Sequence, residues 1–319
     1  MQPGAKKIYR NLSEAQRFPF QAQPWWLDAV CGQEGWEAAL AYDEDGVPIG
    51  AMAYGKSGWK GLPLIRMPQF TAYHHIWMRD MGSERIVRQN HWEYRILEGL
   101  VSQIPGKWLV DQAYAPSFTN GLPFFWKGFQ VQTRYTYQIE TRLPAELLWK
   151  DMESATRNQI RKAKTQVQVR RDGTPEQLYE LVKMLYEKQG KRAPFSLADL
   201  KRVDACLSER QMRTIYIAAD EKGAVHAACY VVWDGRRAYG LLSGAHPEFR
   251  KSGALYLVLW RALKDAAKRE AVFDFEGSMV PKIERVFRSF GAKRVPYLRV
   301  VRYGNRLINF LAVLLGKNR

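Results

Sequence analysis

Two carboxylates in the segment FDFEGS are well placed for acid–base chemistry. Asp274 and Glu276 stand at alternate positions, and alternate residues of a strand point to the same face of a sheet. Two carboxylates at the end of a buried strand can act as a general base and as the group that orients it. The next helix is expected to carry Lys282 and Arg288, where a cation can stabilise a developing anion. Equally, the carboxylates can simply be paired with the nearby arginines.

A second group of residues is suited to binding phosphate. In HPEFRKSGALYLVLW the residues Arg250, Lys251, Ser252 and Gly253 precede an apolar amphipathic run. The free amides and the dipole at the start of a helix attract anions, and a glycine lets the ligand approach closely. The alternative interpretation is a polar turn that only starts the helix.

A third group is the basic segment RNQIRKAK. Arg157, Arg161 and Lys164 are spaced by four and three residues, which places them on one helical face, and Lys162 lies beside them. Such a face can grip phosphates, or it can be an ordinary solvated surface.

The distribution of charge supports a polyanionic partner for the second half of the chain. The net charge is +17. Residues 1–140 carry 14 Lys/Arg and 13 Asp/Glu, whereas residues 141–319 carry 35 and 19. A field of this kind attracts nucleic acid, anionic lipid headgroups or phosphorylated small molecules. A basic surface without a partner is the alternative.

The elements that must position these groups follow the order β-α-α-β-β-β-α-β-α-β-β in the second half. An antiparallel meander is predicted over 213–219, 224–233 and 238–243. It is followed by a helix over 253–269, a short strand over 272–275 and a helix over 281–290 that ends at Gly291. The first half repeats the pattern, with a hairpin over 36–54, a helix over 84–103, a strand over 108–113 and a strand over 130–140.

Several classes of protein are disfavoured. Three scattered cysteines without a CxxC pair suggest neither disulfides nor a zinc site, and the five histidines show no spacing typical of metal ligands. No signal peptide or apolar run of transmembrane length is evident. We therefore expect a cytoplasmic protein without a metal. The segment 306–319 reads as an apolar helix with basic ends, which either docks on the protein or touches the inner face of a membrane.

The ordered set RNQIRKAK, AYGLLSGAHPEFRKSGA, FDFEGS and FRSFGA resembles the GNAT-type domain of the Fem aminoacyltransferases and related bacterial acyltransferases. The first half, with PWWLDAV, MPQFTAYHHIW and NGLPFFWKGFQVQTRYTY, is similar to the N-terminal half of the same group. The resemblance implies a mixed α/β (α+β) fold of two tandem GNAT-like domains, here 1–140 and 141–305, each a mostly antiparallel sheet flanked by helices.

The resemblance also implies a reaction and its partners. Fem enzymes move an amino acid from aminoacyl-tRNA to an amine of a phosphorylated, lipid- or nucleotide-linked cell-wall precursor. In the GNAT pattern Q/R-x-x-G-x-G/A, the turn from Arg250 to Gly253 would hold an acyl-CoA pyrophosphate, although Leu255 stands at the last small position. Arg157, Arg161, Lys162 and Lys282 would then contact the substrate, and Asp274, Glu276 and Arg288 would carry catalysis.

Two alternatives remain open. One is an acetyl- or acyl-CoA-dependent N- or O-acyltransferase for a sugar or polysaccharide precursor, favoured by the turn from Arg250 to Gly253. The other is a non-catalytic GNAT-like protein that binds nucleic acid or a membrane surface, favoured by the charge asymmetry and by the absence of a tyrosine from the helix over 281–290.

Overall fold

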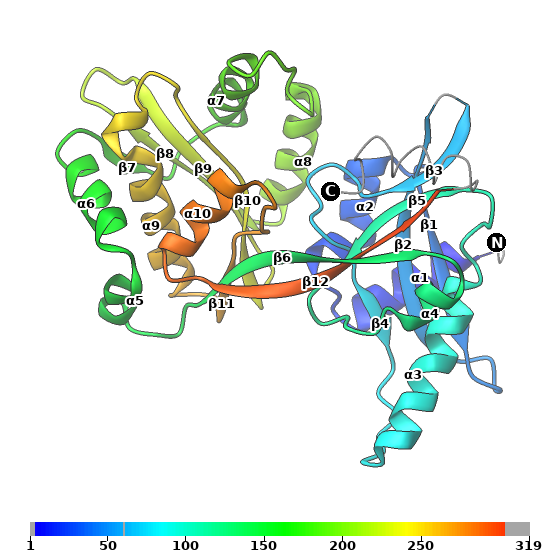
Figure 1. Cartoon of the computed structure of the whole chain (residues 1–319). Coiled ribbons are helices and arrows are strands. Elements are labelled where there is room, and N and C mark those ends of the chain that lie inside the picture. Colours follow the sequence, from blue (N-terminus) through cyan, green and yellow to red (C-terminus); the bar gives the residue numbers. More distant parts are fainter. Residues whose placement is uncertain (1–3, 60, 304–319) are drawn as a thin grey trace. The chain divides into compact units, whose positions relative to one another are not determined.

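The computed structural model describes residues 4–59 and 61–303 of the 319-residue chain. The segment 306–319, expected to be an apolar tail helix, lies outside the described residues. Within them, the chain forms two compact units (Figure 1). The first comprises 4–59, 61–134 and 296–303, and the second comprises 135–295.

The first unit is built on a hairpin and its neighbouring strands. Its strands are β1 (Trp36–Tyr42), β2 (Pro48–Trp59), β3 (Leu62–Arg66), β4 (Ile76–Met78), β5 (Leu109–Tyr114) and the first part of β6 (Gln130–Glu140). Its helices are α1 (Ala5–Ala15), α2 (Pro24–Cys31), α3 (Ile86–Val101) and α4 (Leu122–Trp126), with a 3-10 turn, η1, at Phe20–Ala22. Strands β1, β2 and β3 are antiparallel, and β3 pairs with β5 in parallel.

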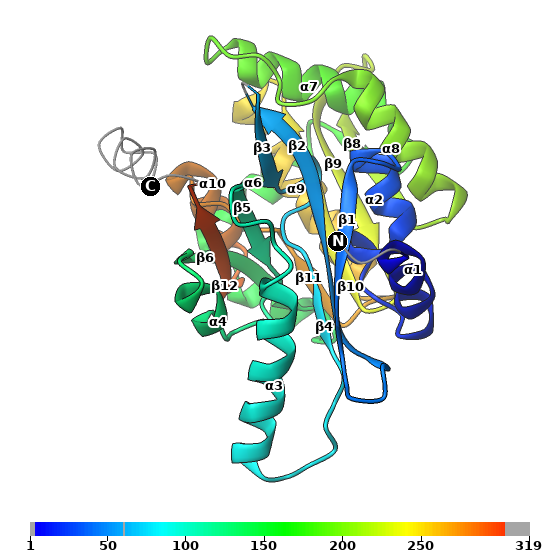
Figure 2. The ribbon, with the colours of Figure 1, turned by 90° about the vertical axis from the view of Figure 1, so that its right-hand side faces the viewer.

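The alternation of side chains in the hairpin explains why both faces of this sheet are covered. Ala39 and Met52 belong to the core formed with α3, whereas Ala38 and Ala53 belong to the core formed with α1 and α2. Figure 2 shows α3 on one side of β1 and β2 and α1 on the other. A sheet with two apolar faces therefore takes helices on both.

The second unit repeats this plan around another meander. Its strands are β7 (Gln168–Arg170), β8 (Arg213–Ala219), β9 (Val225–Trp233), β10 (Arg237–Ala245), β11 (Val272–Asp274) and β12 (Lys293–Arg302), of which β12 continues into the first unit. Its helices are α5 (Ala145–Asp151), α6 (Ser154–Ala163), α7 (Pro175–Glu187), α8 (Leu197–Glu209), α9 (Ala254–Ala266) and α10 (Pro281–Ser289), with a 3-10 turn, η2, at Arg250–Ser252. Tyr216 and Ala218 face the core shared with α6 and α9. In both units two helices, a three-stranded meander, a helix, a strand and a short helix occur in this order, with the extra short strand β4 after the meander of the first unit.

The predicted fold class is therefore confirmed: the chain is a mixed α/β protein with mostly antiparallel pairing and tandem GNAT-like cores. The prediction of two closing strands in the second half corresponds to the single strand β12. Thr174 and Ser196 begin α7 and α8 as capping boxes, which satisfy orphan N–H groups at helix starts.

Each unit is completed by a strand that comes from elsewhere in the chain. In the first unit, Leu298–Arg302 of β12 pairs with β5, and in the second unit, Gln138–Glu140 of β6 pairs with β11. The predicted domains 1–140 and 141–305 follow the order of the chain, whereas the compact units are interleaved through these two strands.

No helix in the described ranges combines the length and the apolar character needed to cross a membrane. Across the same residues, no three His, Cys, Asp or Glu side chains are grouped so that they could hold a metal ion.

Candidate functional site

The candidate site of the second unit begins where two parallel strands diverge. The pairing of β10 with β11 covers Arg237–Tyr239 and Val272–Asp274. Strand β10 then continues beside β9 to Ala245, with an irregularity between Gly240 and Leu242. Ligands of α/β proteins bind beyond the carboxyl ends of parallel strands, where backbone groups are no longer used by a neighbouring strand. The expected carboxylates stand at this point.

Asp274 is the last residue of β11 and is completely buried. Its Oδ1 accepts hydrogen bonds from Thr136 Oγ1 at 2.5 Å and from the Glu276 amide at 2.8 Å. Its Oδ2 accepts one from Gln138 Nε2 at 2.8 Å. A buried carboxylate needs such donors to offset its lost hydration. This arrangement suits a carboxylate that fixes the end of the strand in place.

Glu276 is held next to Asp274 through its backbone. Its φ is +56°, and Gly277 follows with φ +69°. A Cβ on Gly277 would lie 2.3 Å from the Tyr135 carbonyl oxygen, so only glycine fits this close approach. Since β11 ends at Asp274, strand alternation does not extend to Glu276. The turn still brings the two residues together, with Glu276 half-buried.

The predicted phosphate-binding residues form the start of α9. Gly253 has φ +77° and is the N-cap of this helix, and a Cβ there would lie 2.5 Å from the carbonyl oxygen of Gln159 on α6. Ser252 is buried and its Oγ accepts the Ala254 amide at 3.2 Å. Arg250 and Lys251 are exposed. The turn therefore combines a helix start with two cations in solvent.

Two histidines that were not predicted as site residues, His226 and His246, pack on the phenylalanine just before this turn. The ring of Phe249, which caps η2, is stacked on His226 at 4.0 Å and lies 4.7 Å from the ring of His246. His226 Nε2 also lies 3.2 Å from Asp220 Oδ2. Because His226 and His246 belong to different segments, only the pairing of β9 with β10 brings them to the same phenylalanine.

The basic residues of α6 divide into two sets. The Arg157 guanidinium donates to backbone carbonyls at the end of α5, including that of Lys150 at 3.0 Å, so it is engaged in holding α5. Arg161 and Lys164 instead lie over the Trp149 ring, at 5.6 and 5.9 Å from its centroid. Lys162 is exposed. The helical face predicted from the spacing is thus only partly available to a ligand.

The structure adds residues from α9 to this surface. Trp260 packs on Trp149 with ring centroids 5.4 Å apart, and Lys264 lies over Trp260 at 5.7 Å. Burial, together with the nearby charges of Lys164 and Arg261, lowers the pKa of Lys264. Cations crowded in this way favour a polyanion, because it removes their mutual repulsion. We call Trp149, Arg161, Lys164, Trp260 and Lys264 the tryptophan–lysine patch.

The cations predicted on α10 lie at its exposed side. Lys282 is exposed. Arg288 Nε donates to Glu284 Oε1 at 3.1 Å, and its Nη1 lies 3.7 Å from Glu153 Oε1. Hydrogen bonds from Tyr137 and Arg288 lower the pKa of Glu284. Arg288 is therefore engaged with carboxylates of α10 and the start of α6.

In the first unit, the position that corresponds to the diverging strands β10 and β11 is occupied by the segment that follows β3. There, β3 pairs with β5 from Leu64 to Arg66. The following segment continues along β5: the Met67 amide donates to Asp111, and the His74 amide donates to Ala113 at 2.7 Å. Helix α3 begins after Arg85 without a glycine turn. The features that suit an anionic ligand are thus gathered in the second unit.

In comparisons with known proteins, the family match lies within the second unit, where the candidate site is. Residues 150–279 match the family model described as acetyltransferase (GNAT) domain. Comparison with curated proteins finds no match.

Among solved structures, the fold is similar to that of FemX, with a TM-score of 0.60 and 13% identity over 86% of this chain and 90% of that one. It is also similar to the C-terminal domain of a putative lysylphosphatidylglycerol synthetase from Agrobacterium fabrum (TM-score 0.52, 12% identity, 98% and 95% covered). A third similar structure is L-PGS from Bacillus licheniformis (TM-score 0.50, 10% identity, 87% and 88% covered). At these identities the likeness concerns the fold, and the fold is Fem-like.

Proposed function

We propose that this chain is an acyltransferase that moves an aminoacyl group onto an amine of a cell-envelope precursor. The observation that carries the proposal is the glycine turn at the start of α9, which lies in the GNAT domain whose parallel strands diverge at Asp274. The titles of the similar structures FemX and lysylphosphatidylglycerol synthetase make an envelope acceptor the natural class to test.

The reaction can be written with the groups of this site. The acceptor amine attacks the ester carbonyl of the donor, a C–N bond forms, and the C–O bond to the leaving hydroxyl breaks. The amine loses a proton and the leaving oxygen gains one. In this proposal Glu276 receives the proton and returns it to the leaving oxygen, while Asp274 positions the Glu276 backbone through its hydrogen bond. Lys282 and Arg288 stay candidates for stabilising the intermediate's oxyanion.

The donor proposed is aminoacyl-tRNA, and the support is electrostatic. The second unit carries 30 Lys/Arg and 20 Asp/Glu. The tryptophan–lysine patch sets three cations over the half-buried Trp149 ring and the buried Trp260 ring, and such a cluster of cations suits a nucleic-acid backbone. Part of the affinity should then depend steeply on salt.

A second candidate donor is acyl-CoA. Arg250 and Lys251 beside the helix start favour a pyrophosphate. Leu255, which replaces a small residue of the GNAT pattern, is half-buried and packs against the core of the second unit. Its side chain is thus partly accommodated inside the protein, and the turn retains its geometry for phosphate.

One pair of measurements can identify the class of donor and the class of acceptor. Calorimetry at low and moderate salt would compare acetyl-CoA, charged tRNA and a UDP-linked muropeptide, and a transfer assay would follow a radiolabelled amino acid into the muropeptide. Label transfer that falls at least 100-fold in Glu276→Gln, but is unchanged in the exposed-turn control Glu221→Gln, supports the proposal. Acetyl transfer without aminoacyl transfer would establish the acyl-CoA alternative. Binding of tRNA without any transfer would indicate a non-catalytic protein.

A further inference from the structure

A cavity of about 480 Å³ lies at the far end of α9 from the glycine turn. Three segments of the second unit line it: Arg142 after β6, Gly235 and Arg236 in the β9–β10 turn, and residues 267–271 after α9. Thirteen residues of helix separate this end from Gly253, which corresponds to about 20 Å. The cavity is therefore separate from the glycine turn. Its lining residue Ala271 lies just before β11, whereas Asp274 ends that strand about 10 Å further along.

Glu270 holds these segments together. Its backbone carbonyl accepts a hydrogen bond from Thr141 Oγ1 at 2.5 Å, and its Oε1 accepts the Gly235 amide at 3.1 Å. The residue is 7% exposed, yet Oε2 has no hydrogen-bond partner in the part of the chain that the structure describes. A buried carboxylate oxygen without a donor is costly. It is therefore well suited to receive one from a ligand.

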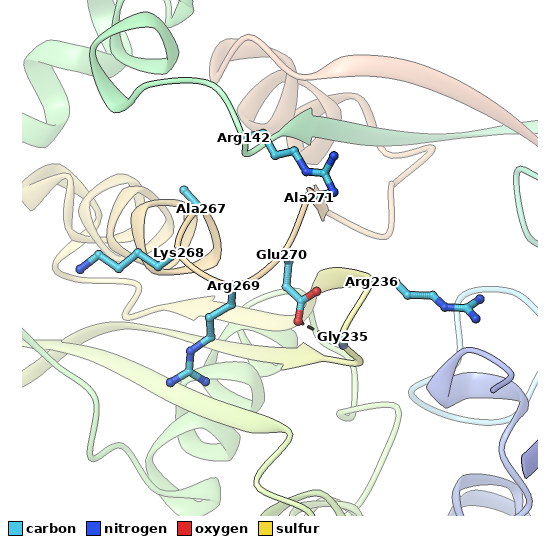
Figure 3. Close-up of a pocket in the computed structure, with 8 residues that line it drawn as sticks. All are labelled: Arg142, Gly235, Arg236, Ala267, Lys268, Arg269, Glu270 and Ala271. Carbon is cyan, nitrogen blue, oxygen red and sulfur yellow. Dashed lines mark hydrogen bonds between the residues drawn. The ribbon is translucent and has the colours of Figure 1, made fainter.

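Four cations surround this carboxylate. Arg142, Arg236, Lys268 and Arg269 are all exposed, and within the described ranges none of them forms an ion pair. Figure 3 shows the Glu270 carboxylate in the middle, directed toward Gly235, with the charged ends of the four side chains fanned out around it. The end of a helix attracts cations such as Lys268 and Arg269. Arg142 and Arg236 come from other segments, so the helix dipole does not account for them.

We propose that this cavity binds a small phosphorylated molecule that also carries a hydroxyl group. Arg269 lies over the Trp233 ring at 4.8 Å, and Arg142, Arg236 and Lys268 would turn inward onto the phosphate, since an anion offsets the mutual repulsion of cations. The hydroxyl would donate to Glu270 Oε2 and so satisfy the orphaned acceptor. Burial raises the pKa of Glu270, which agrees with a carboxyl whose Oε2 has no donor among the described residues.

Titration calorimetry of the full chain with ribose 5-phosphate, inorganic phosphate and ribose, at moderate salt, tests the proposal. One saturable site for ribose 5-phosphate is expected, with at least tenfold weaker binding of phosphate and of ribose. Arg142→Gln and Arg236→Gln should each weaken binding about tenfold, and both positions are exposed, so the fold should persist. Glu270→Leu, which removes every acceptor for the hydroxyl at this position, should reduce the affinity to that of phosphate alone.

Two controls separate this site from general charge effects. Arg192→Gln removes an exposed cation elsewhere in the unit, and Lys251→Gln removes one from the glycine turn. Neither should change the affinity. Loss of binding in Lys251→Gln would place the ligand at the glycine turn. Equal losses of affinity in all variants would indicate non-specific electrostatic attraction. Equal affinities for phosphate and ribose 5-phosphate would show that Glu270 does not contact the ligand. Each of these results, or the absence of saturable binding, would overturn the proposal.

Discussion

Asp274 illustrates how a single residue can be fixed by its neighbours. Its carboxylate accepts hydrogen bonds from Thr136, Gln138 and the Glu276 amide, and the Thr136 side chain is itself fully buried. Replacing Thr136 by valine keeps the shape but leaves a buried carboxylate with one donor fewer. We expect Thr136→Val to lower the free energy of unfolding by about 1–3 kcal/mol, measured by urea denaturation.

The same substitution at Thr133 is the matched control, because this threonine lies on the same strand with an exposed side chain. Thr133→Val should change stability by less than about 0.5 kcal/mol. Equal effects at both positions would show that the Asp274 network does not depend on the Thr136 hydroxyl.

The burial of His74 predicts how the stability of the fold depends on pH. It is buried in the first unit, neither ring nitrogen has a hydrogen-bond partner among the residues described, and burial lowers its pKa from 6.5 to about 4. Between these values the unfolded chain binds more protons than the folded one. Stability should therefore fall as the pH falls through this window, by up to about 1.4 kcal/mol per pH unit from this residue.

Urea denaturation of His74→Leu across pH 4 to 7 measures this contribution. The variant should show a flatter dependence of stability on pH than the unmodified chain. His91→Leu, at an exposed position, should keep the original slope. If the slope of His74→Leu were unchanged, protonation of this histidine would not be coupled to folding.

At the scale of elements, the start of α9 depends on a glycine for two separable reasons. Gly253 has a positive φ, and its α-carbon faces the Gln159 carbonyl. Gly223 has a positive φ of +83° but open space around it, so Gly223→Ala should cost only the conformational term of about 1 kcal/mol. Gly253→Ala should cost more and, because α6 and η2 must separate, weaken phosphate-ligand binding at this turn at least tenfold.

Thermal unfolding and calorimetry with acetyl-CoA or charged tRNA would check both variants. The comparison isolates the close contact between η2 and α6 from the cost of the backbone angle. Similar stability and similar ligand affinity for the two variants would mean that the contact with Gln159 has no role in shaping the turn.

The sequence predicted those elements whose local pattern is strong. The strand over 130–140 is recognisable from its alternation. The two helices expected before the meander of the second half are α7 and α8, which begin at the capping boxes of Thr174 and Ser196. Helices α1 and α2 and the short strands β3 and β4 were not predicted, since brief segments carry little periodicity. The tryptophan–lysine patch also escaped, because Trp149 and Lys264 become neighbours only when α5, α6 and α9 pack together.

At the scale of the whole chain, the two units share one plan but differ in what their diverging strands can offer. In the second unit the strands part beside a glycine-started helix, whereas in the first unit residues after β3 continue along β5. When a fold is duplicated in this way, one copy can keep the ligand site while the same position in the other copy is filled by packed chain. Local patterns could not have indicated this difference, because it depends on which distant segment follows each strand.

The interleaving of the units leads to a prediction about fragments. In the first unit, β12 supplies Val300 and Val301, both buried, and Arg299, whose Nε donates to Asp111 Oδ1 at 2.7 Å. Burying two valines contributes about 3–6 kcal/mol, much of the 5–15 kcal/mol that a domain typically has. A fragment of residues 1–140 should therefore lack a cooperative unfolding transition.

The same fragment joined through a flexible Gly/Ser linker to residues 296–303 should recover that transition, because the missing strand is restored beside β5. Circular dichroism melting and urea titration of the two fragments compare them directly, and a version of the joined fragment with Val300→Asp supplies the control, since an unpaired charge in the core should abolish the recovery. Cooperative unfolding of 1–140 alone would show instead that the first unit is complete without β12, and that the order of the chain, rather than the pairing of its strands, defines the folding unit.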